Sequence, residues 1–188
     1  MASIIGIEAH YKPMPKIILE NRRLFKKCRN VLDIGAGRGR FVRFFLENFD
    51  NIEEYVAVEP FPRSISKLKE VGDDRLIIVA DLWENVRDIF LRKRFDIVVF
   101  WDVLMFMDLS FISENPVEAA KTELNNIINI TRKYFLFSLH PVKKTILPRK
   151  NYREILKHLD NHSKLKLVAK KYLNRLYSLL FNYIGGNI

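Results

Sequence analysis

The residues best suited to bind a ligand lie between positions 31 and 39, in the stretch "VLDIGAGRG". An apolar run that contains Asp33 leads directly into Gly35, Gly37 and Gly39, which stand at alternate positions. Glycines at this spacing let the chain turn tightly and let a ligand approach the backbone closely. The stretch therefore predicts a binding loop with a carboxylate beside it.

The charge of Asp33 discriminates between the ligands that use such loops. A dinucleotide-binding loop has a third glycine at the sixth position, counted from Gly35, where this chain has Arg40. A phosphate loop ends in Gly-Lys-Ser/Thr, which the stretch lacks. At about 4 Å, Asp33 would repel a pyrophosphate by roughly 1–4 kcal/mol, whereas it would attract an ammonium group. We therefore expect a ligand with a cationic end.

The elements that must position this loop alternate along the chain. Helical stretches separate short apolar strands, which are expected at residues 30–34, 55–58, 76–79, 95–100 and 134–139. Strands that are apolar on both faces indicate a parallel sheet covered by helices on both sides. Two further strand-like runs, 165–173 and 176–184, are separated by only two residues, too few for a crossover connection, so they form an antiparallel hairpin. The predicted fold is α/β, with a seven-stranded, mostly parallel sheet and this C-terminal hairpin.

The segment before the first strand has helical periodicity. Pro13 and Pro15 precede an apolar stripe with the 3.6-residue spacing of one amphipathic helix, formed by Ile17, Ile18, Leu24, Phe25 and Cys28. Cys28 is the single cysteine, which excludes a disulfide framework and fits a reducing cytoplasm. No apolar run approaches the roughly 18–20 residues of a membrane span, so we expect no stable membrane insertion.

The glycine stretch resembles the first motif of the class I (Rossmann-like) S-adenosylmethionine-dependent methyltransferases, apolar–apolar–Asp–apolar–Gly–x–Gly–x–Gly. Those enzymes have this order of strands with a terminal antiparallel hairpin, so the resemblance extends to residue 188. It implies a single methyltransferase-like domain over residues 1–188, comprising a basic N-terminal helix (1–29), a cofactor-binding core (30–140) and a basic helix and hairpin (141–188). It also implies S-adenosyl-L-methionine as the cofactor, with its methionine end held by Asp33, Gly35, Ala36, Gly37 and Gly39.

The resemblance assigns the rest of the cofactor site to the ends of the next strands. In the family an acid that closes the second strand holds both ribose hydroxyls, which implies Glu59, beside Pro60. An acid after the third strand contacts the adenine amino group, which implies Asp81, with the Leu82 backbone reading the ring edge. Trp101, after the fourth strand, is expected to cover the adenine or the sulfonium through its ring face.

The acceptor site should lie where the fourth and fifth strands end. There Asp102 is a candidate to orient an acceptor amine or hydroxyl or to act as a base, and His140 is a candidate general base. The stretch "WDVLMFMD" resembles the loose pattern of methyltransferases that act on small molecules, and the Asn/Asp-Pro-Pro-Tyr/Phe pattern of amino-group methylation is absent. A basic rim is expected from Lys143, Lys144, Arg149, Lys150 and Arg175.

The net charge of +10 is concentrated at the two ends of the chain. Residues 1–30 carry seven Lys and Arg against two Glu, and residues 141–188 carry eleven against two acids. We therefore expect a cytoplasmic methyltransferase with a small, anionic substrate. Two alternatives stay open: an RNA (tRNA or rRNA) methyltransferase whose basic ends hold phosphates, and a non-catalytic cofactor-binding subunit.

Overall fold

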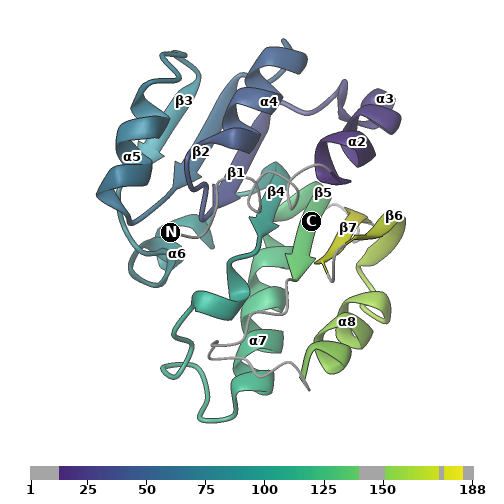
Figure 1. The fold of residues 1–188 in the computed structure, drawn as a ribbon. Helices are drawn as coiled ribbons and strands as arrows, with labels where there is room; N and C mark the ends of the chain where they lie inside the picture. The colour runs from purple at the N-terminus through teal and green to yellow at the C-terminus, as the bar shows by residue number, and fades with distance from the viewer. Residues whose placement is uncertain (1–12, 140–150, 174–175, 184–188) are drawn as a thin grey trace.

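A seven-stranded sheet forms the centre of the structure, a computed structural model that describes residues 13–139, 151–173 and 176–183 (Figure 1). The strand order is β3-β2-β1-β4-β5-β7-β6. The first five strands in this order are parallel to one another, and β7 is antiparallel to both β5 and β6. The strands are β1 (Asn30–Ile34), β2 (Glu54–Val58), β3 (Leu76–Val79), β4 (Phe95–Trp101), β5 (Thr131–Leu139), β6 (Leu165–Leu173) and β7 (Leu176–Tyr183). The predicted fold class is confirmed.

Helices cover both faces of the sheet, as a parallel sheet with apolar faces requires (Figure 1). One core lies beneath α2 (Pro13–Glu20), α3 (Arg22–Phe25), α4 (Arg40–Asn48) and α5 (Pro62–Lys69). The other lies beneath α6 (Trp83–Phe90), α7 (Pro116–Asn129) and α8 (Tyr152–Asp160), with a short 3-10 helix, η1 (Leu104–Phe106), at its edge. All seven residues of β4 are buried, and all of them except Asp96 are apolar.

The N-terminal helix differs from the prediction, because it breaks at Asn21 into α2 and α3. The Asn21 side chain donates to the Ile17 carbonyl at 2.8 Å, so it competes for a backbone acceptor of the helix. Ile17, Phe25 and Cys28 are buried as predicted, but Leu24 is 37% exposed, so its place in the apolar stripe was wrong. No helix in the described ranges is long and apolar enough to cross a membrane.

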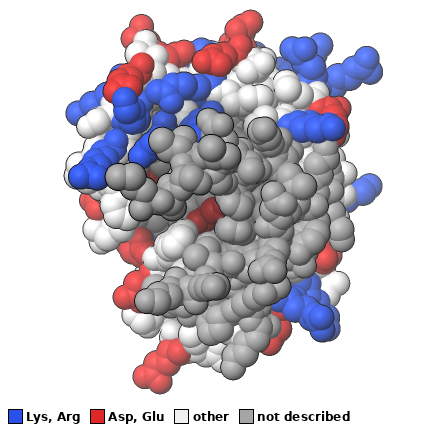
Figure 2. All heavy atoms as spheres, viewed as in Figure 1, with Lys and Arg blue, Asp and Glu red and all other residues white. Residues whose placement is uncertain are grey.

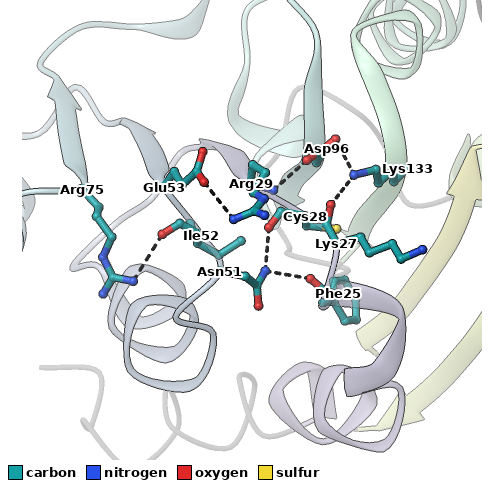
Figure 3. A network of polar contacts seen from close by, with 10 residues as sticks. All are labelled: Phe25, Lys27, Cys28, Arg29, Asn51, Ile52, Glu53, Arg75, Asp96 and Lys133. Atoms are coloured by element: carbon teal, nitrogen blue, oxygen red, sulfur yellow. Dashed lines mark hydrogen bonds and ion pairs between the residues drawn. The ribbon is translucent and has the colours of Figure 1, made fainter.

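A polar network fixes the start of β1 at the amino edge of the sheet (Figure 3). The Asp96 carboxylate, which is 4% exposed, accepts the Arg29 backbone N–H at 2.7 Å and forms an ion pair with Lys133 at 3.0 Å. The Asn30 side-chain oxygen accepts the Asp96 N–H at 2.7 Å. These contacts join the chain before β1 to β4 and β5, and so set the start of the strand that carries the glycine loop.

Asp96→Ala should therefore lower the free energy of unfolding by about 2–3 kcal/mol, because it leaves the part-buried Arg29 N–H without an acceptor and the Lys133 ammonium, which still donates to the Lys27 carbonyl, without its carboxylate. Glu53→Ala is the matched control. It removes an exposed carboxylate that pairs with the Arg29 guanidinium at 2.8 Å, and it should cost less than about 1 kcal/mol. Urea denaturation of both variants measures the difference. Equal losses would show that burial does not strengthen the Asp96 contacts.

Candidate cofactor site

The glycine loop connects β1 to α4 at the carboxyl edge of the sheet, where ligands of open α/β sheets bind (Figure 1). The loop is held against β2, because the N–H groups of Gly35 and Ala36 both donate to the Val58 carbonyl, at 2.8 and 3.1 Å. Gly39 then begins α4 in the left-handed conformation, with φ +76°. The loop is thus a fixed part of the sheet edge.

Gly35 and Gly37 both have positive φ angles, but their surroundings differ. A Cβ at Gly35 would lie 2.4 Å from Val103 Cγ2, so close packing with the chain after β4 excludes any side chain there. A Cβ at Gly37 would meet no atom of the described residues within 4 Å. Packing within this part of the chain therefore leaves room for a side chain at Gly37, and the same space is open to a ligand.

Glu59 lies directly beside this open backbone. It follows β2 and is 3% exposed; its Oε2 accepts the Gly37 N–H at 2.8 Å and its Oε1 accepts the Phe61 N–H at 3.0 Å. The carboxylate therefore joins the glycine loop to the turn that begins α5. Each oxygen retains a further lone pair that could accept a hydroxyl hydrogen. Pro60, which is half-buried, lies between Glu59 and Phe61 in this turn.

Asp33 is buried within the sheet, at 1% exposure, on the face covered by α4. The Tyr55 hydroxyl of β2 donates to its Oδ2 at 2.8 Å. Burial raises the pKa of the Asp33 carboxyl to about 7; the hydrogen bond from Tyr55 lowers it, and the nearby charge of Glu59 raises it. The two acids are thus electrostatically coupled across the loop. Their proximity disfavours a second ionised carboxylate and favours a cationic ligand.

Asp81 and Leu82 lie at the end of β3, where they lead into α6. The Asp81 Oδ1 accepts the Leu82 N–H and the Asn85 side-chain N–H, both at 2.7 Å, while Oδ2 has no hydrogen-bond partner among the described residues. Leu82 is 47% exposed. The acid that the sequence suggests for this strand end therefore has one carboxylate oxygen without a partner among the described residues, and the roles of Asp81 and of the Leu82 backbone stay predictions.

Trp101, the last residue of β4, is 4% exposed and packs against Phe41 of α4, with ring centroids 5.2 Å apart. Its ring belongs to the core beneath α4, and its contact with the cofactor stays a prediction.

Asp102 follows in a strained conformation, with φ +55°. The fully buried Ser138 of β5 holds it there, because its hydroxyl accepts the Asp102 N–H at 2.9 Å and donates to Asp102 Oδ1 at 2.7 Å. A non-glycine residue in this region costs about 1–2 kcal/mol, so Ser138 supports a side-chain position that the backbone alone disfavours.

The remaining acceptor-site candidates lie outside the described residues. These are His140, Lys143, Lys144, Arg149, Lys150 and Arg175. Tyr55 and Ser138 are two further residues that hold this site and that no sequence motif singles out. Their signal was weak, because each acquires its partner only through pairing of neighbouring strands.

The strand order, the antiparallel β7 and the glycine loop after β1 define a class I S-adenosylmethionine-dependent methyltransferase fold. A family model described as a methyltransferase domain matches residues 8–112, which is more than half of the 188 residues. The chain belongs to this methyltransferase domain family, and its cofactor is S-adenosylmethionine. No curated protein sequence matches the chain.

Solved structures share the fold at low sequence identity. A methyltransferase from Clostridium acetobutylicum that depends on S-adenosylmethionine has a TM-score of 0.61 at 14% identity, over 97% of this chain and 95% of that one. Magnesium protoporphyrin IX methyltransferase from Synechocystis, solved with bound S-adenosylmethionine, has a TM-score of 0.61 at 13% identity, covering 95% and 79%. An rRNA methylase from Streptococcus thermophilus has 0.61 at 12%, covering 90% and 96%. Two of these names state an acceptor, rRNA in one and magnesium protoporphyrin IX in the other, so the fold leaves the acceptor undetermined.

Proposed function

We propose that S-adenosylmethionine lies across the tips of β1, β2 and β3, with its methionine end at the glycine loop and its nucleoside toward Glu59 and Asp81. The observation that carries this assignment is the open backbone of Gly37 directly beside the Glu59 carboxylate. The residues present fit the cofactor chemically. When ionised, Asp33, Glu59 and Asp81 offer acceptors and negative charge. These suit the ammonium, the sulfonium, the two hydroxyls and the amino group of the cofactor.

We further propose that the acceptor is a small anionic molecule. Among the described residues, Arg38 and Arg63 are exposed on the β1 and β2 side of the site. Lys and Arg atoms gather over α5 and beside α4, at the upper left of Figure 2. Acids follow on the β3 and β4 side, where Asp81, Glu84 and Asp108 lie. A rim with one basic and one acidic side suits a compact anion better than a phosphate backbone crossing the whole rim.

The chain's own residues have limited chemistry to supply. When bound, the cofactor brings an activated methyl carbon and a good leaving group, so the protein must align the acceptor and exclude water. Asp102 is proposed to hold the acceptor's nucleophilic group, or to take its proton, from the position that Ser138 fixes. His140 is proposed as a second group at the end of β5.

The RNA alternative receives less support from the described residues. The basic N-terminal segment, including Arg22 and Lys26, precedes β1 at the amino edge of the sheet. A strand of five residues spans roughly 16 Å, so these charges lie on the side of the sheet away from the glycine loop. We also propose a cytoplasmic location, because the reducing conditions there suit the free, buried Cys28.

Transfer of a labelled methyl group from S-adenosylmethionine into fractionated cell extract tests the acceptor. We expect label in small molecules that an anion exchanger retains. Asp102→Asn should slow this transfer about 100-fold without changing cofactor affinity, because Asn tolerates the left-handed backbone and still accepts from Ser138. Label found only in RNA would contradict the small acceptor while leaving the cofactor site intact. An unchanged rate in the variant would remove Asp102 from the reaction.

A further inference from the structure

A polar groove lies between α7 and α8, apart from the cofactor site. It is an open groove with a volume of about 610 Å³, a size typical of small-molecule sites. The residues that line it all have polar side chains and include Lys121 and Asn125 of α7, Lys157 and His158 of α8, and His162 and Ser163 in the turn that follows. None of these residues takes part in the proposed methyl transfer.

Two histidines in this groove contact each other, and their hydrogen bonds fix which nitrogens carry protons. The rings of His158 and His162 meet edge to face, with centroids 5.7 Å apart. The His158 Nε2 lies 2.8 Å from the Asn125 amide oxygen, an acceptor, so Nε2 carries the hydrogen. His162 Nδ1 accepts the Lys164 N–H at 3.2 Å, which leaves the hydrogen of the neutral ring on Nε2. The His162 ring is therefore a donor toward the groove.

Burial and the charges around the pair favour the neutral form of both rings. Burial lowers the pKa of His158, and Lys121 lowers it further, while Glu118 opposes this. Burial also lowers the pKa of His162, as do His158 and Lys164. The other charged groups that line the groove are Glu154, 3.9 Å from Lys121, and Lys157. A bound anion would offset the positive charges and allow the rings to take up a proton.

The alternatives to an anion fit the lining less well. No three His, Cys, Asp or Glu side chains in the described part of the chain are grouped as metal ligands, which argues against a metal site here. Glu154 is the only carboxylate among the lining side chains, and it faces Lys121. Lys121 already donates to Glu118 at 2.8 Å, so the donors left for a phosphate group are the Lys157 ammonium, the His162 ring and the Ser163 hydroxyl.

We propose that the groove between α7 and α8 binds a small phosphorylated molecule, and that the histidine pair takes up a proton, on His158 Nδ1, when the phosphate enters. The proposal does not depend on the identity of the methyl acceptor. It predicts an inverted pH dependence: phosphate carries more negative charge at higher pH, so fixed positive charges alone would bind it better there. Proton uptake by the histidines instead makes binding tighter as the pH falls.

Titration of inorganic phosphate into the full chain, followed by calorimetry and by the histidine ring signals in NMR spectra, tests the site. Binding should be at least about tenfold tighter near pH 6 than near pH 8, and phosphate should raise the titration midpoint of the His158 ring. Lys157→Gln should weaken binding about tenfold. Lys67→Gln, which removes an exposed helical lysine from α5 on the other face of the sheet, should not.

Three outcomes would overturn the proposal. They are no binding at about 20 mM phosphate near pH 6, equal affinity at the two pH values, or equal affinity in Lys157→Gln and Lys67→Gln. His158→Gln gives an independent check, because glutamine keeps a side-chain donor for the Asn125 oxygen but cannot take up a proton. This variant should lose the pH dependence and keep weak binding. If this variant fails to fold, the comparison of Lys157→Gln with Lys67→Gln still tests the proposal.

Discussion

Gly37→Ala should weaken S-adenosylmethionine binding at least about 100-fold while the protein stays folded. At φ +57° an alanine is strained by about 1–2 kcal/mol, but its methyl group would meet no atom of the described residues within 4 Å. The methyl group would instead occupy the space beside the Glu59 carboxylate, where the cofactor is proposed to approach the backbone. The loss should therefore appear in calorimetric binding far more than in the free energy of unfolding.

Gly72→Ala provides the matched control for this backbone strain. Gly72 has φ +64° and also has no atom within 4 Å of the Cβ position, but it lies in the turn between α5 and β3 at the amino edge. Both variants should lose similar stability in urea, and only Gly37→Ala should lose cofactor binding. Equal binding by the two variants would contradict the assignment of the glycine loop. Gly35→Ala could not serve here, because its clash with Val103 would disturb the fold itself.

Local sequence patterns predicted the fold well, because parallel strands buried on both faces leave a strong signal. β1, β3 and β6 have the predicted bounds. The prediction was short at β5, which begins at Thr131 instead of residue 134. The missed residues include Arg132 and Lys133, whose charges are not typical of a buried strand. They belong to the first residues of β5, which pairs with β4. A charged strand end is defined by its neighbour and not by its own periodicity.

The sequence indicated the candidate cofactor site only through residues that form local patterns at turns. Three glycines after an apolar run, and acids at the next two strand ends, were visible because each stands at a turn. The partners that hold these residues were not visible. Tyr55 reaches Asp33 across the β1–β2 pair, and Ser138 reaches Asp102 across the β4–β5 pair. Such contacts depend on strand register, which no periodicity within a single segment specifies.

Asp33→Asn should stabilise the protein at about pH 8 and leave its stability almost unchanged at about pH 4. The folded-state pKa of about 7 lies above the ordinary value of 3.8. Between these values the unfolded chain releases the proton and the folded chain keeps it, so stability falls as the pH rises and is lowest above 7. The full difference corresponds to roughly 4 kcal/mol as an upper limit. Asparagine removes this penalty and still accepts the Tyr55 hydrogen bond, which urea denaturation across the pH range can measure.

The same substitution should weaken cofactor binding about tenfold or more at about pH 8, because a neutral amide does not attract an ammonium group. In the wild type, cofactor affinity should rise as the pH passes through 7 and Asp33 ionises; in Asp33→Asn that rise should be lost. Tyr55→Phe is the opposite control. It keeps the buried carboxylate but removes its donor, so it should destabilise the protein at high pH. If the stabilised Asp33→Asn variant bound the cofactor normally, Asp33 would be a residue of the core alone.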